Sequence, residues 1–185
     1  VIASTEGKKS REIVEYGIEA LKAVWHRGAV DADGKTGDGA GIHVEIPKDF
    51  FIEKIEVTGH DYDNSEICVG MIFLPRNDYS SQESCKTIVE SELTKNNFSI
   101  YGWRQVPVNP KILGEKAFQT MPEIIQVLFK SNDSNLIDKD LERKIYETRK
   151  KIENKAFELS LNNFYICSIS SKSIIYKGLY FCLLY

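Results

Sequence analysis

Residues Ser10 to Phe51 read SREIVEYGIEALKAVWHRGAVDADGKTGDGAGIHVEIPKDFF, and this stretch carries the clearest pattern in the chain. Its first part spaces apolar and small residues three and four apart, which predicts an amphipathic helix packed on one side. Ser10 is a suitable N-cap, and Glu12 in the first turn favours the positive end of the helix dipole. The helix should end near Arg27, because Gly28 follows. The residues of the stripe are Ile13, Val14, Gly17, Ile18, Leu21, Val24 and Trp25.

The segment from Gly28 to Gly41 is rich in glycine and aspartate and holds no large apolar residue beyond Val30. It predicts a loop whose backbone adopts conformations that glycine reaches freely. IHVEI, residues 42–46, then alternates as a strand does. A polar pair at a helix end, followed by a glycine-rich loop and a strand, is typical of folds that bring backbone close to a small polar ligand.

The remaining patterns predict an α/β chain of mixed order, with helix layers packed on a largely antiparallel sheet. Strands are expected at residues 69–74, 98–108 and 124–130, and two final strands, 164–170 and 173–185, carry a hairpin signal between them at Ser171-Lys172. One helix should begin at a Ser80 or Ser81 cap and point Cys85 and Leu93 inward. Another should run from Asp138 to about Phe157.

Composition narrows the function classes. The chain has 185 residues and a formal charge of −3, a balance that gives no electrostatic case for nucleic acid, whose backbone is bound by clustered Lys and Arg. Its longest apolar run, Leu179 to Tyr185, has 7 residues, whereas a membrane-spanning helix needs roughly 20. Neither a nucleic acid nor a membrane is therefore expected as a partner. The four cysteines, Cys68, Cys85, Cys167 and Cys182, show no ligand or disulfide spacing and fit a cytoplasmic protein.

The residues alone do not complete any known catalytic or ligand-binding motif. Gly34-Lys35-Thr36 resembles a phosphate-binding loop, but the glycine required at position 29 is Ala29. Asp31-Ala32-Asp33-Gly34 resembles a calcium loop, but its twelfth position is Ile42 rather than glutamate. The three histidines share no metal-ligand spacing, so we expect no metal site. The cysteines on the predicted helix and strands are expected to be buried and inert.

Beyond these patterns, the segment WHRGAVDADGKTGDGAG, residues 25–41, resembles a known family. It is similar to the start of the class II (N-terminal-nucleophile) glutamine amidotransferase domain of the bacterial glutamate synthase large subunit. The resemblance continues through VGMIFLPR, IYGWRQVPVNP, LGEKA, the region from Arg149 to Ile152, and FYICSISSKSIIYKG. We therefore expect residues 1–178 to be part of a type 2 glutamine amidotransferase domain, and residues 179–185 to be an apolar tail of uncertain origin.

The resemblance implies an α+β fold, the four-layer αββα sandwich of N-terminal-nucleophile hydrolases, incomplete here at both ends. It also implies a mechanism. An N-terminal cysteine attacks the carboxamide of glutamine, its own α-amine serves as base, and an acyl-enzyme is hydrolysed to glutamate with release of ammonia. An Asn side chain and a Gly N–H stabilise the oxyanion. In the parent enzyme, ammonia then passes to 2-oxoglutarate for glutamate biosynthesis.

Comparison with the family pattern defines the candidate site. The nucleophilic cysteine is expected upstream of Val1, and the segments that clamp glutamine and supply the oxyanion hole are expected after Gly178. The residues that carry over are His26, Arg27 and Gly28, which support the active site, with Asp38 and Gly39 in the adjoining loop. A purely structural bracing role for these residues stays open. The chain by itself is expected to be inactive.

The resemblance also implies cofactors and partners. No cofactor is expected in this chain, whereas the parent enzyme implies FMN and iron–sulfur clusters, with reduced nicotinamide or ferredoxin as electron donor. Glutamine is the family's substrate, and the remaining glutamate synthase domains or the small subunit are candidate partners. The alternative function is a non-catalytic binding module that keeps the amidotransferase scaffold.

Overall fold

The computed structural model of the chain describes residues 1–37 and 39–178, without the side chain of Trp25. The chain divides into two compact units. Unit 1 contains Val1–Val44, Val108–Met121 and the described residues of Ile175–Tyr185. Unit 2 contains Glu45–Pro107 and Pro122–Ile174.

Unit 2 is built on a four-stranded sheet in the order β3-β4-β2-β5. The strands are β2 (Cys68–Leu74), β3 (Phe98–Gln105), β4 (Glu123–Ser131) and β5 (Tyr165–Ser170). Every neighbouring pair is antiparallel, with Cys68 opposite Phe129 and Val69 opposite Leu128. The predicted antiparallel strands are thereby confirmed, because each of the four falls on a predicted run.

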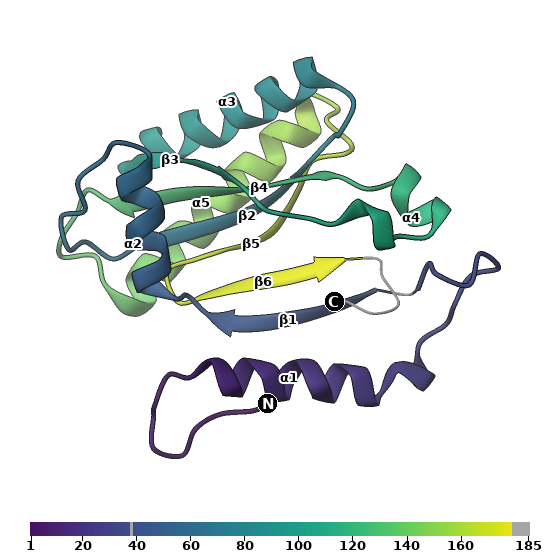
Figure 1. Cartoon of the computed structure of the whole chain (residues 1–185). Coiled ribbons are helices and arrows are strands. Elements are labelled where there is room, and N and C mark those ends of the chain that lie inside the picture. The colour runs from purple at the N-terminus through teal and green to yellow at the C-terminus, as the bar shows by residue number, and fades with distance from the viewer. Residues whose placement is uncertain (38, 179–185) are drawn as a thin grey trace. The chain divides into compact units, whose positions relative to one another are not determined.

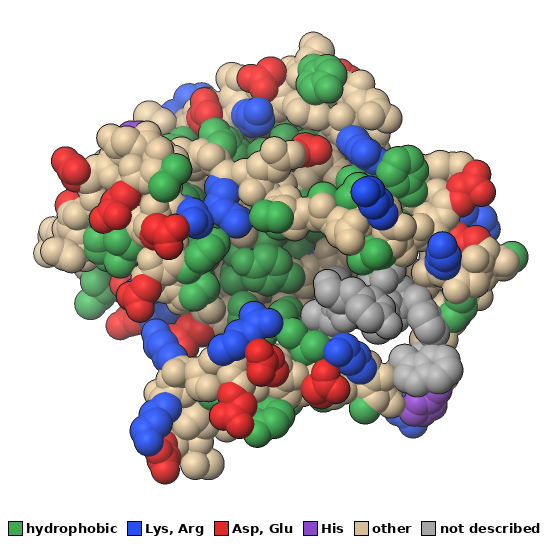
Figure 2. All heavy atoms as spheres, viewed as in Figure 1, with side chains coloured by type: hydrophobic (Ala, Val, Ile, Leu, Met, Phe, Trp, Pro, Cys, Tyr) green, Lys and Arg blue, Asp and Glu red, His purple; other side chains and the backbone are tan. Residues whose placement is uncertain are grey.

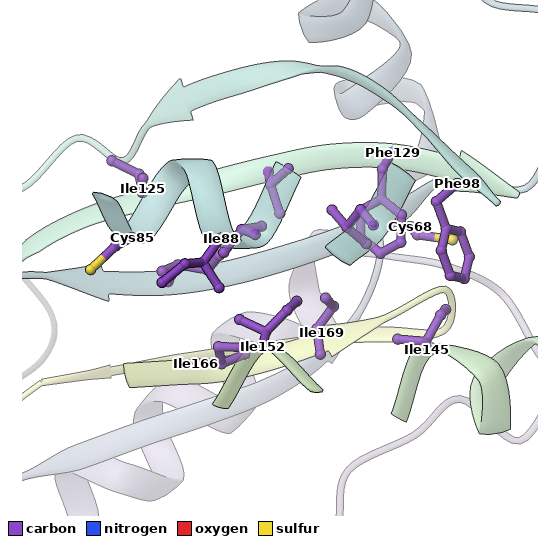
Figure 3. Packing of buried hydrophobic residues seen from close by; sticks show 14 of the residues in the cluster. Cys68, Cys85, Ile88, Phe98, Ile125, Phe129, Ile145, Ile152, Ile166 and Ile169 are labelled. Atoms are coloured by element: carbon purple, nitrogen blue, oxygen red, sulfur yellow. The ribbon is translucent and has the colours of Figure 1, made fainter. Parts of the chain in front are cut away.

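Helices α3 (Tyr79–Lys95) and α5 (Asp138–Glu158) pack on one face of this sheet and against each other (Figure 1). Their inward side chains and the facing strand residues form one buried apolar cluster, part of which is drawn in Figure 3. Phe98 and Phe129 meet edge to face there, with ring centroids 5.3 Å apart. The predicted inward residues Cys85 and Leu93 are fully buried. The opposite face is buried as well at Val69, Met71 and Leu128.

Two details of unit 2 differ from the sequence-based expectations. Helix α3 is capped by Asp78 rather than by Ser80 or Ser81, because the Asp78 carboxylate accepts hydrogen bonds from the Ser81 backbone N–H at 3.0 Å and from its hydroxyl at 2.6 Å. Helix α2 (Lys48–Val57), which contacts β3, was not predicted. Its sequence, KDFFIEKIEV, buries only Phe51 and Ile55, so its periodic signal is short.

Unit 1 contains α1 (Arg11–Ala23), the short 3-10 helices η1 (Trp25–Arg27) and η2 (Pro110–Ile112), and α4 (Glu115–Gln119). Strand β1 (Ala40–Glu45) pairs with β6 (Ser173–Gly178). The strands approach closely at Gly41, where a Cβ atom would lie 2.9 Å from the carbonyl oxygen of Tyr176. Helix α1 begins at its predicted Ser10 cap, and the described residues of its apolar stripe are half-buried except Val24, which is exposed.

On the face drawn in Figure 2, basic and acidic side chains of the described residues are interspersed rather than gathered by sign. Such mixing builds no extended potential of one sign. Among the described residues, no helix is long and apolar enough to cross a membrane.

The predicted hairpin between the last two strands is wrong. Strands β5 and β6 follow one another directly, but β5 pairs with β2 whereas β6 pairs with β1 in a separate sheet. The physical reason lies in α5, where the Glu142 carboxylate accepts hydrogen bonds from the Ser170 hydroxyl, the Ser171 N–H and the Ser171 hydroxyl at 2.9, 2.6 and 2.8 Å. These bonds occupy the connection, so it does not fold back as a tight turn.

We predict that Glu142→Ala lowers the free energy of unfolding by about 2 kcal/mol, since it removes a charged acceptor from a half-buried backbone N–H and two hydroxyls. Glu147→Ala is the matched control on the same helix. Its partner Arg143 is exposed, so this substitution should change stability by less than about 0.5 kcal/mol. Urea unfolding of both variants measures the difference. Equal losses would show that Glu142 does not anchor the connection.

Candidate functional site

The predicted site begins where α1 ends. The α-helix stops at Ala23, earlier than expected, and η1 continues the chain to Arg27 as a tighter turn in which the Arg27 N–H donates to the Val24 carbonyl oxygen at 2.9 Å. His26, Arg27 and Gly28 are all exposed. Within the described residues, no acceptor binds the Arg27 guanidinium.

The glycine-rich segment after Gly28 is a closed turn rather than an open loop. Val30 and Gly37 pair as an antiparallel bridge. Inside it, the Asp31 N–H donates to the Thr36 carbonyl oxygen at 2.8 Å, and the Gly34 N–H donates to the Asp31 carbonyl oxygen at 2.9 Å. Gly34 has a φ of 68°, a conformation that glycine adopts at little cost. The sequence-based prediction that this loop needs glycine conformations is confirmed here.

The Asp33 carboxylate stabilises the turn by accepting hydrogen bonds from residues inside it. One of its oxygens accepts the backbone N–H groups of Lys35 and Thr36 at 2.9 and 2.7 Å, and the other accepts the Thr36 hydroxyl at 2.5 Å. These bonds favour the ionised carboxylate, so they hold the pKa of Asp33 well below its usual range, with the Thr36 hydroxyl as the largest cause. An Asp side chain that binds N–H groups two and three residues ahead forms an Asx-type turn.

Asp31 is the second carboxylate of this turn. Its side chain pairs with the Lys116 ammonium group at 2.7 Å and accepts the Ala32 N–H at 2.6 Å. The hydrogen bond from Lys116 is the main reason that the pKa of Asp31 is lowered. Lys116 lies in α4, so a residue far along the sequence contacts the candidate site within unit 1.

The other predicted loop residues are placed only in part. Gly39 has a φ of 98°, again in the region that favours glycine. Asp38 lies outside the described residues. The chain order therefore brings His26, Arg27 and Gly28 directly before the closed turn.

Among the described residues, the thiols and the candidate metal ligands give no second site. Cys68 and Cys85 are fully buried, and burial raises the pKa of the Cys68 thiol and brings that of Cys85 to about 11. Such thiols are poor nucleophiles at neutral pH, as the sequence led us to expect. Across residues 1–37 and 39–178, no three His, Cys, Asp or Glu side chains gather as metal ligands would.

Sequence reasoning missed Asp33, Thr36 and Lys116. The Asp-x-x-Thr spacing around Gly34 is a signal that could have revealed the turn. The contact of Asp31 with Lys116 carries no local signal, because the two residues are 85 positions apart.

An α+β chain with antiparallel sheets and a glycine turn after its first helix fits the family that its sequence matches. The model of the class II glutamine amidotransferases matches residues 1–183. The chain belongs to this family, which has the N-terminal-nucleophile hydrolase fold.

The relatives that the chain resembles are glutamate synthases. It is 52% identical to the glutamate synthase [NADPH] large chain of Azospirillum brasilense over 179 residues, which is 97% of this chain and 12% of that protein. It is 39% identical to ferredoxin-dependent glutamate synthase 1 of Arabidopsis thaliana over 180 residues, 96% of this chain and 11% of the relative. The sequence thus corresponds to the amidotransferase region of glutamate synthases and spans about an eighth or less of their length.

We predict that Thr36→Val raises the pKa of Asp33 toward the usual Asp value of about 3.9, because it removes the hydroxyl donor that stabilises the carboxylate while keeping the side-chain shape. Carbon NMR of the carboxyl groups during an acid titration measures the change. Because the folded pKa is depressed, the stabilisation by Asp33 is present above the unfolded pKa and is lost as pH falls through the folded one. In Thr36→Val the unfolded pKa is unchanged and the folded one is higher, so the stabilisation by Asp33 should be smaller and its loss should be complete at a higher pH.

The Asp78 carboxyl, whose pKa Ser81 lowers in the same way, is the internal control and should titrate unchanged. An unaltered Asp33 titration in Thr36→Val would contradict the turn geometry.

Proposed function

We propose that this chain forms the first part of a glutaminase site, in which His26, Arg27 and Gly28 support the nucleophile and Asp38 and Gly39 border it. The single observation that carries the proposal is the exposed Arg27 guanidinium, without a described partner, directly before a closed glycine turn. Membership of the class II glutamine amidotransferases supplies the reaction class. The relatives are much longer than this chain, and its part in their activity is what we propose here.

The proposed reaction is hydrolysis of the glutamine carboxamide. A cysteine thiol at a chain terminus attacks the amide carbon, the terminal amine takes the thiol proton and passes it to the leaving nitrogen, and ammonia departs. Water then attacks the thioester, which breaks the carbon–sulfur bond and yields glutamate and the free thiol. The described cysteines, Cys68, Cys85 and Cys167, are all buried. The nucleophile is therefore not one of the described cysteines, and this chain supplies support for it.

Arg27 suits a positioning role. Its guanidinium is planar, permanently charged and carries five N–H donors, so it can bind two carbonyl oxygens or a carboxylate in a fixed orientation. Gly28 leaves room for another backbone segment to approach. The closed turn after it limits how far this junction can move, because Asp33 ties Lys35 and Thr36 to one conformation.

The rest of the parent reaction lies outside this chain. An amidotransferase domain of this class carries no cofactor of its own, and FMN and iron–sulfur clusters belong to other domains of glutamate synthase. We propose those domains as the partners that receive ammonia. We also propose a cytoplasmic location, which is supported by the buried thiols Cys68 and Cys85, since they form no disulfide.

The test uses a hybrid enzyme in which residues 1–178 replace the matching segment of the Azospirillum brasilense large chain. Arg27→Ala should lower glutamine-dependent glutamate formation by roughly 10²-fold, the scale of losing one oriented donor at a reacting centre. Ammonia-dependent formation should stay within about twofold, because free ammonia bypasses the glutaminase site. Arg27→Lys should restore only part of the activity.

Arg11→Ala is the matched control, since Arg11 is an exposed arginine of α1 that pairs with Glu15. It should leave both activities unchanged. Equal loss of both activities in Arg27→Ala would assign Arg27 a bracing role, and no loss would remove it from the site. The same substitution at the matching arginine of the unaltered Azospirillum enzyme repeats the test without the hybrid junctions.

A further inference from the structure

Gly114 lies against the glycine turn in unit 1. It is the buried N-cap residue of α4, and its carbonyl oxygen accepts the Phe118 N–H at 2.9 Å. A Cβ atom at this position would lie 2.3 Å from the Asp33 carboxylate, 2.3 Å from the Thr36 hydroxyl and 2.7 Å from the Thr36 backbone nitrogen. Any side chain here would overlap the bonds that close the turn.

The glycine is required for space and not for its backbone conformation. Gly114 has a φ of −70° and a ψ of 163°, values that any residue adopts. By contrast, Gly34 of the turn itself has a φ of 68°. The absence of a side chain at Gly114 therefore serves the approach of α4 to the turn, because nothing in the local backbone demands it.

Lys116 adds a second contact between the same two segments. Its ammonium group pairs with Asp31 at 2.7 Å, and its side chain is 67% exposed. Exposed ion pairs contribute little by themselves. The steric fit at Gly114 therefore contributes more than Lys116 to the position of the turn against α4. Lys116 contacts the turn at Asp31.

We propose that Gly114 is a positioning residue for the glutaminase site, assisted by Lys116. The segment Val108–Met121 acts as a fixed support for the turn that follows His26-Arg27-Gly28, and the turn cannot shift toward α4 without losing its Asp33 bonds. This inference rests on the proposed function for its catalytic consequence. The structural part of the inference, that α4 holds the turn in place, rests only on the contacts described above.

The first experiment measures amide hydrogen exchange in the 185-residue chain. Gly114→Ala should raise the exchange of the Asp31, Gly34, Lys35 and Thr36 amides by about tenfold, because overpacking displaces the turn. Gly17→Ala is the matched control, since a Cβ there meets no atom within 4 Å. It should leave these amides unchanged. The amides of β2 and β4 in unit 2 report whether the variant is still folded.

Lys116→Met should raise the exchange of the same amides by a smaller factor, and the increase should match that produced in the wild type by high salt. Lys111→Met, an exposed lysine of η2 without a described ion pair, is its control. Unchanged exchange of the turn amides in Gly114→Ala would overturn the proposal.

The second experiment separates this proposal from the proposed function. In the hybrid enzyme, Gly114→Ala should lower the ratio of glutamine-dependent to ammonia-dependent activity by about tenfold, since misplacement of a positioning group by a fraction of an ångström is costly. A loosened turn with an unchanged ratio would overturn the positioning role while leaving the proposed function intact. If Arg27→Ala leaves the ratio unchanged, the proposed function fails, and the exchange data still decide whether α4 fixes the turn.

Discussion

The candidate site depends on one carboxylate, that of Asp33. The segment from Gly28 to Gly41 has the composition of a flexible loop, yet Asp33 binds two backbone N–H groups and a hydroxyl within three residues of itself. Those bonds close the residues between Val30 and Gly37 into a turn. Because His26 and Arg27 lie directly before that turn, the same carboxylate limits the freedom of the residues that we propose to support a nucleophile.

Carboxylates of this kind organise three separate junctions of the chain. Asp33 closes the glycine turn, Asp78 caps α3, and Glu142 directs the chain from β5 to β6. Each accepts one or more backbone N–H groups together with the hydroxyl of a nearby Ser or Thr. These hydrogen bonds are strong because the carboxylate is charged, and its two oxygens have enough lone pairs to accept all the donors at each junction. Apolar packing builds the sheet and helices of unit 2, whereas these polar bonds determine where the chain changes direction.

The sequence predicted the regular elements well and the junctions poorly. The four strands of unit 2 and helices α1, α3 and α5 carry apolar patterns long enough to show their period. Helix α4 has five residues, too few to show one. The hairpin prediction failed because a short Ser-Lys connection has the same local sequence whether its two strands pair with each other or enter different sheets. Glu142, whose hydrogen bonds direct this connection, is 28 residues away from Ser170 in the sequence. In the site, His26 and Arg27 were found by resemblance. The Asp33 turn has a signal in the sequence, the Asp-x-x-Thr spacing, whereas the role of Gly114 could be recognised only from the fold.

The most direct test of the account is the partition between glutamine and ammonia when Asp33 is removed. Asp33→Ala in the hybrid enzyme is compared with Asp78→Ala, which deletes a carboxylate of the same type from the cap of α3. We predict that Asp33→Ala lowers the ratio of glutamine-dependent to ammonia-dependent glutamate formation by about tenfold, and that Asp78→Ala leaves this ratio unchanged. An unchanged ratio in Asp33→Ala, or equal falls in both variants, would contradict the claim that the closed turn positions the glutaminase site.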